Sequence, residues 1–70
     1  METYDAFESS NIASLKYDAD TLTLQVSFHN GSDYQYFDIP QRIWEAFKLA
    51  ESKGVFLNAE VKGTYRYSKV

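Results

Sequence analysis

The sequence predicts a small α+β domain. A three-stranded antiparallel β-meander is followed by two helices packed on one face, with residues 64–70 as either a short C-terminal strand or an extended tail. Residues 21–29 alternate apolar and polar side chains without a break, which is typical of a strand with one wet face. An apolar stripe with helical spacing follows Pro40. The connections are short, as in a small α+β domain, and 70 residues make one domain only.

The composition explains how so short a chain can bury a core. Six Tyr, five Phe and one Trp make up 17% of the residues, and each aromatic side chain buries roughly 150–250 Å². No cysteine is present, so neither a disulfide nor a thiolate metal site contributes, and this fits a reducing compartment. No apolar run reaches the ~20 residues needed to cross a membrane, and the acidic start lacks the pattern of a signal peptide. We expect a cytoplasmic protein.

Charge is unevenly distributed along the chain, whose net charge is −3. Residues 1–39 hold seven acidic side chains and one lysine, whereas residues 40–70 hold six basic and three acidic side chains. The negative sum argues against a protein that coats nucleic acid. The asymmetry allows either a local basic surface or attraction between the two halves of the fold.

The first elements follow from local patterns. Residues 1–9 are polar, acidic and without a period, so we expect a flexible acidic tail ahead of a domain spanning residues 10–70. Residues 12–18 predict the first strand, and Ile12 either precedes it or lies at a β-bulge because it is out of register with the other apolar positions. The second strand, residues 21–29, places four apolar side chains on one face: Leu22, Leu24, Val26 and Phe28.

The loop after the second strand decides which face carries Tyr34 and Tyr36. A two-residue turn at Asn30-Gly31 would pair Val26 with Gln35 and place both tyrosines on the polar face. A one-residue change in loop length moves both to the other face.

A three-residue loop, residues 29–31 with the glycine in the left-handed conformation, gives the opposite result. It sets Val26 opposite Tyr34 and Leu24 opposite Tyr36, on the core face. We predict this register because two tyrosines bury more apolar area than the residues that would replace them. Phe37 then falls on the wet face.

Pro40 opens the first predicted helix, because its missing N–H costs nothing in a first helical turn. Lys53-Gly54 is a C-terminal signal, with a cation in the last turn and a glycine just past it. The apolar stripe between them consists of Ile43, Trp44, Phe47 and Ala50. We assign Tyr34, Tyr36, Pro40, Trp44 and Phe47 to the structural core.

Residues 55–62 are ambiguous between a second helix and a strand. Leu57 and Val61 are spaced i, i+4, which favours a short helix ending at Gly63, although the β-rich composition allows a strand. We predict the helix.

The inventory of side chains provides no enzyme site. The one histidine, His29, lies at the predicted hairpin loop, where no buried base is expected even though Ser27 and Asp33 flank it. One histidine without cysteine leaves only scattered carboxylates for a metal, and the three glycines are too dispersed for a phosphate-binding loop. We therefore expect no catalysis, no cofactor and no metal.

Two spaced motifs resemble those of the KTSC domain. The first is Tyr34-x-Tyr36 ahead of Pro40, and the second is Ala50-x-Ser52-Lys53-Gly54-x-Phe56-x-Asn58, followed by Val61 and Tyr65. Ser10-x-Ile12 and Leu15-x-Tyr17-Asp18 precede them, so the resemblance covers about residues 10–70. It implies a domain that occurs at the C-terminus of some lysyl-tRNA synthetases and as a free-standing small bacterial protein. The family that it resembles has no agreed catalytic or ligand residues. RNA binding has been suggested for that family because the domain is attached to some lysyl-tRNA synthetases.

Nucleic-acid binding is the function that the closing segment favours, because aromatic rings beside cations suit the stacking of single-stranded bases. The candidate residues are Lys62, Tyr65, Arg66, Tyr67 and Lys69. So few cations predict weak, salt-dependent binding to RNA or tRNA.

The alternative is a protein–protein interaction module or a homodimerising domain without nucleic-acid activity. The predicted sheet has an exposed edge strand, a surplus aromatic residue at Phe37 and an aromatic tail, which invite self-association or a partner protein. The sequence therefore leaves RNA, a protein partner and a second copy as candidate partners, with no membrane.

Overall fold

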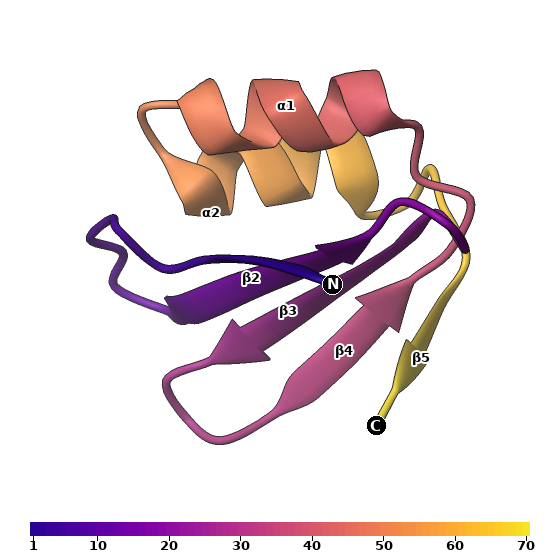
Figure 1. Cartoon of the computed structure of the whole chain (residues 1–70). Helices are drawn as coiled ribbons and strands as arrows, with labels where there is room; N and C mark the ends of the chain where they lie inside the picture. The colour runs from indigo at the N-terminus through magenta and orange to yellow at the C-terminus, as the bar shows by residue number, and fades with distance from the viewer.

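Five strands form one antiparallel sheet in the order β1-β2-β3-β4-β5, and the helices lie on one of its faces (Figure 1). The computed structural model describes residues 1–70. The predicted α+β class is confirmed, but three strands with a short final one were predicted and the sheet has five. In chain order the elements are β1 (Glu2–Tyr4), β2 (Ile12–Asp18), β3 (Thr23–Phe28), β4 (Asp33–Tyr36), α1 (Gln41–Leu49), α2 (Lys53–Phe56), the π-helical turn η1 (Leu57–Val61) and β5 (Tyr67–Lys69).

The strand missing from the prediction is β1, which lies within the residues assigned to the tail. It pairs with β2, with Glu2 opposite Tyr17 and Tyr4 opposite Leu15. A strand of three residues is too short to show an alternating pattern in the sequence. It is held by contacts with other elements. The Glu2 carboxylate accepts a hydrogen bond from Lys48 Nζ at 2.6 Å, which ties β1 to α1.

The β2–β3 pair confirms the bulge at the start of β2 and corrects the start of β3. The register shifts between Ile12 and Ser14, and Ile12 is nevertheless buried. Leu22 was predicted to face the core, but it lies in the turn before β3 with a φ of 56° and is 38% exposed. Its carbonyl accepts the N–H of Ile39 at 2.9 Å, a contact with the segment entering α1, and β3 begins at Thr23, two residues later than predicted.

The hairpin between β3 and β4 has the predicted three-residue loop. Val26 lies opposite Tyr34 and Leu24 opposite Tyr36. Gly31 has a φ of 90°, which an L side chain rarely adopts. The register is therefore confirmed, and the tyrosine pair lies on the helix-facing side of the sheet.

The helical layer differs from the prediction at one point. The first helix ends at Leu49 rather than at Lys53-Gly54, and those two residues begin α2 instead. The Lys53 ammonium turns back and donates hydrogen bonds to the carbonyls of Lys48, at 3.0 Å, and of Ala50. The cation thus caps the C-terminus of α1, as the pattern indicated, but from the next helix.

The core lies between the sheet and the helices. Trp44 stacks on Tyr17 with ring centroids 5.3 Å apart, and the Tyr17 hydroxyl donates to the Ile39 carbonyl at 2.6 Å. Leu57 and Val61 are both buried, and residues 55–61 are helical rather than a strand, as predicted, although they belong to two elements, α2 and η1, and the helical segment ends at Val61. The eleven buried hydrophobic residues are Ile12, Leu15, Tyr17, Leu24, Val26, Tyr36, Ile39, Trp44, Phe47, Leu57 and Val61.

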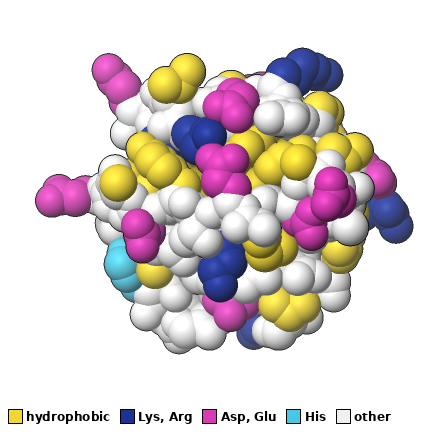
Figure 2. Space-filling view, viewed as in Figure 1, with side chains coloured by type: hydrophobic (Ala, Val, Ile, Leu, Met, Phe, Trp, Pro, Cys, Tyr) yellow, Lys and Arg dark blue, Asp and Glu magenta, His cyan; other side chains and the backbone are white.

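The surface carries no large region of one charge on the face drawn in Figure 2. Lys and Arg side chains there lie apart from one another, with Asp and Glu side chains and apolar atoms between them. Neither helix is long and apolar enough to span a bilayer.

Candidate functional site

The helix-facing side of the sheet becomes progressively more exposed toward β5. On this side Leu24 and Tyr36 lie opposite each other, and Tyr67 lies opposite Tyr36 on the far strand. Leu24 is fully buried and Tyr36 is 2% exposed, whereas Tyr67 is 63% exposed. The helical layer therefore ends over β4 and leaves the ring of Tyr67 accessible.

A groove opens at this boundary, between the end of η1, the β3–β4 loop and the last two strands. Its volume is about 480 Å³, which lies within the range of small-ligand sites. We call it the aromatic groove. It is lined by Phe28, Asn30, Ser32, Tyr34, Tyr36, Lys62, Gly63 and Tyr67.

Four aromatic rings form a continuous lining in the groove. Phe28 meets Tyr34 edge to face, with centroids 5.7 Å apart. Tyr67 lies 5.9 Å from Tyr34 and 5.8 Å from Tyr36, tilted by 43° and 37°. Of these four rings, that of Tyr67 belongs to the most exposed residue.

Two lysines supply the positive charge on this side of the sheet. Lys62 Nζ lies 5.9 Å from the centroid of the Phe28 ring, at the rim of the groove. Lys69 lies opposite Tyr34 in the β4–β5 pair, so the two side chains share one face. Burial, with smaller effects of Tyr34 and Tyr67, raises the pKa of the Tyr36 hydroxyl. This hydroxyl therefore keeps its proton at neutral pH and can donate a hydrogen bond.

The five predicted binding residues do not share one surface. Lys62 and Tyr67 line the groove, and Lys69 lies on the same face of the sheet. Arg66 pairs with Phe37 on the opposite face, where its guanidinium lies 5.7 Å from that ring and binds the Asp38 carboxylate at 3.0 Å. The side-chain period of two along an extended segment separates neighbours in the sequence.

Tyr65 was predicted as a binding residue and Tyr34 as a core residue. Tyr65 is half-buried against the core, and it lies outside the groove. Tyr34, which the sequence assigned to the core, is half-buried and lines the groove. Phe28 was not a candidate at all. The β4–β5 pairing, which places Tyr67 beside the Tyr34-x-Tyr36 pair, could have identified Tyr34 as a groove residue. The β3–β4 register, which brings Phe28 next to Tyr34, could have identified Phe28.

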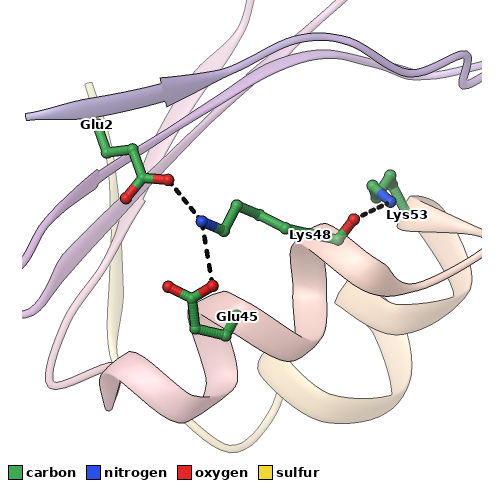
Figure 3. A network of polar contacts seen from close by, with 4 residues as sticks. All are labelled: Glu2, Glu45, Lys48 and Lys53. Carbon is green, nitrogen blue, oxygen red and sulfur yellow. Dashed lines mark hydrogen bonds and ion pairs between the residues drawn. The ribbon is translucent and has the colours of Figure 1, made fainter.

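A separate polar network fastens β1 to the helices (Figure 3). Lys48 reaches between the carboxylates of Glu2, at 2.6 Å, and Glu45, at 3.2 Å. The hydrogen bond from Lys48 lowers the pKa of Glu2, and the same bond raises the pKa of Lys48. Lys53 lies at the end of this network, 5% exposed, and its burial lowers its pKa. These side chains bond to one another and to backbone carbonyls within the fold, so we do not treat them as a ligand-binding site.

His29 stays at the hairpin loop. Its side chain is exposed, and its Nε2 lies 3.0 Å from the Ser9 carbonyl oxygen. Ser27 and Asp33 lie opposite each other on the polar face of the sheet. The histidine is therefore held by the backbone of the segment before β2 rather than by an acidic partner.

The comparisons with known proteins agree with this architecture. The family model of the KTSC domain matches residues 8–70. The chain is 35% identical over 63 residues to a lysine–tRNA ligase of Trichormus variabilis, covering 90% of this chain but only 11% of that protein. An uncharacterized protein of Stutzerimonas stutzeri is 35% identical over 66 residues, covering 93% of each chain. The crystal structure of a KTSC domain protein from Yersinia pestis has a TM-score of 0.86 at 34% identity, covering 99% of both chains.

Proposed function

Because this chain belongs to the KTSC domain family, we propose that it is a non-enzymatic binding domain whose aromatic groove holds single-stranded RNA. The observation that carries the proposal is the groove itself, with four aromatic rings beside Lys62 and an exposed Tyr67 at its edge. Aromatic side chains stack on bases of any sequence, and nearby cations attract the backbone. The cytoplasm is where we place such a protein.

The family relatives support the RNA partner. The chain matches 11% of the length of a lysine–tRNA ligase, a protein named for its action on tRNA. An appended domain that holds a single-stranded segment would add a second contact to such a substrate. For the present chain we propose the same chemistry without the ligase activity.

The affinity should be low and should depend on salt. Of the candidate cations, only Lys62 and Lys69 lie on the groove side of the sheet. Arg66 forms an ion pair with Asp38 on the opposite face. Each neutralised phosphate releases counterions, so few contacts give weak binding that falls as salt rises.

A titration of labelled single-stranded RNA at about 50 mM and about 200 mM salt tests the proposal. We expect weak binding at low salt, less at high salt, and loss of most binding in the double variant Lys62→Ala/Lys69→Ala. Lys16→Ala is the matched control, because Lys16 lies opposite Gln25 on the polar face of the sheet. Arg66→Ala should also leave binding nearly unchanged.

A protein-interaction module is the second candidate, and an open sheet edge favours it. All three residues of β5 are exposed, and its outer edge has no partner strand. Such an edge can pair with another chain. Absence of RNA binding at low salt, together with concentration-dependent dimerisation in sedimentation, would support this candidate and contradict the first.

A further inference from the structure

We propose that the aromatic groove holds one unpaired nucleotide, with its base stacked on Tyr67 and its phosphate at Lys62. The inference deepens the proposed RNA binding and rests on it. It commits the site to one unit of a single strand rather than to a duplex or to a long track of bases.

The size and closure of the groove limit how much of a strand it can hold. Its volume of about 480 Å³ is bounded by the β3–β4 loop through Asn30 and Ser32, and by the end of η1 through Lys62 and Gly63. A groove of this volume has the size of a site for one small ligand. The next bases of a strand would lie outside it.

The stacking surface is asymmetric. Tyr36 is 2% exposed and Tyr34 is half-buried, so both offer less ring surface to a ligand than an exposed side chain would. Tyr67 is 63% exposed and is therefore the ring that can offer a whole face to a base. Bases inside a duplex are already stacked on their neighbours, so only an unpaired base can use this face.

Polar side chains line the same groove as the aromatic rings. The Asn30 Oδ1 accepts the N–H of Ser32 at 3.0 Å, which fixes the side chain and leaves its amide NH₂ without a partner in the fold. This NH₂ group can donate to a ring nitrogen or carbonyl of a base. Tyr36, whose phenol is protonated at neutral pH, lines the same groove.

The charge at the rim identifies the ligand as anionic. Lys62 is exposed at the end of η1, and no acidic side chain lines the groove. An aromatic site without a cation would equally suit an organic cation or an apolar peptide, but Lys62 repels the former and gains nothing from the latter. A planar ring joined to a phosphate satisfies both the rings and the lysine.

The test compares adenosine 5′-monophosphate, inorganic phosphate, single-stranded RNA and blunt duplex RNA of the same sequence, using amide chemical shifts of the full chain. We expect the mononucleotide and the single strand to shift the same amides, around Asn30, Gly63 and Tyr67. The mononucleotide should compete with the single strand, while phosphate alone and the duplex should not.

Variants at Tyr67 separate stacking from strand structure. Tyr67→Leu keeps an apolar side chain in β5 but removes the ring, and we expect about tenfold or greater loss of affinity for the mononucleotide and the single strand. Tyr67→Phe keeps the ring and should bind within about twofold of the original protein. Unchanged affinity in Tyr67→Leu would overturn the inference, and its unchanged spectrum elsewhere would exclude misfolding.

The remaining outcomes distinguish the two proposals. Equal binding of duplex and single strand that needs Lys62 but not Tyr67 would overturn the nucleotide site and leave RNA binding standing. Displacement by phosphate alone would also overturn it. Binding of the mononucleotide without binding of RNA would support the site and contradict the proposed RNA function.

Discussion

Lys53 shows how one side chain can join three parts of a small fold. It is 5% exposed and has no carboxylate partner, yet it donates to two carbonyls at the end of α1 and lies 5.7 Å and 5.6 Å from the rings of Tyr4 and Phe7. The negative end of a helix and the faces of aromatic rings both attract a cation. These contacts offset part of the cost of burying the charge, and the lowered pKa of Lys53 shows that burial remains the largest effect.

We predict that Tyr17 makes the stability of the fold depend on pH in the alkaline range. Burial, with a smaller effect of Asp18, raises its pKa above the ordinary 10.0. The unfolded chain therefore loses this proton first, so the stabilisation is complete below about pH 10 and is lost as the pH rises through the raised pKa of the folded state. We expect the free energy of unfolding, measured with urea, to fall as the pH rises above about 10.

The variant Tyr17→Phe isolates this effect. It removes the donor to the Ile39 carbonyl, so we expect a loss of about 1–3 kcal/mol at neutral pH. The free energy of unfolding of Tyr17→Phe should fall less steeply with rising pH than that of the original protein, because one titrating group has been removed. Tyr36, Lys48 and Lys53, whose pKa values are also shifted, titrate in both proteins and cancel in the comparison. Equal declines in the two proteins would contradict the assignment.

At the scale of elements, the motif that resembles the KTSC family has a structural explanation. Ser52 accepts the N–H of Val55 and so caps α2, while Lys53 caps α1. Phe56 stacks on Phe47, with centroids 4.8 Å apart. The run from residue 50 to residue 58 therefore specifies how one helix ends and the next begins.

Two glycines allow this view of the elements to be tested. Gly31, in the β3–β4 loop, has a φ of 90°, so Gly31→Ala should cost about 1–2 kcal/mol of stability. Gly54 lies in α2, where an added methyl would sit 3.4 Å from the Asn11 side chain. Because alanine favours a helix, Gly54→Ala should be neutral or stabilising by about 0.5 kcal/mol.

Thermal or urea unfolding of the two variants gives the answer. A clear loss in Gly54→Ala, equal to that of Gly31→Ala, would mean that the contact with Asn11 cannot adjust. A neutral Gly31→Ala would contradict the hairpin geometry.

The elements predicted correctly were those specified by neighbouring residues. The alternation in β3, the loop at Gly31 and the helical spacing of Leu57 and Val61 are all local signals. The strand β1 was missed because a distant contact holds it, and the end of α1 was placed too late because its capping lysine belongs to the next helix. Lys53 acts on α1 from the following helix, and Glu2 is held by Lys48.

The candidate site was only partly accessible from the sequence for a related reason. Lys62, Tyr67 and Lys69 were identified by composition, but the groove exists because β5 pairs with β4 and η1 ends above them. Neither the β4–β5 pairing nor the position of η1 can be predicted from the pattern of neighbouring residues. Arg66 was grouped with its neighbours although strand geometry sends it to the other face.

For the whole molecule, the distribution of charge predicts the form of the salt dependence. The net charge is −3, and the groove side offers two lysines. The logarithm of the binding constant for single-stranded RNA should fall with the logarithm of salt with a slope of about −1.4, from two phosphate contacts. Lys62→Ala should reduce the slope to about −0.7. Titrations over several salt concentrations measure both, and a slope steeper than about −3 would indicate a wider basic surface than the groove provides.

The position of the single tryptophan has a practical consequence for all of these measurements. Trp44 is fully buried against Tyr17, on the α1 side of the core, and it does not line the aromatic groove, where every fluorescent side chain other than the phenylalanine is a tyrosine. Tryptophan emission therefore follows the opening of the core in the unmodified protein. A ligand in the groove would act on three of the six tyrosines, Tyr34, Tyr36 and Tyr67, and so change tyrosine emission without contacting Trp44.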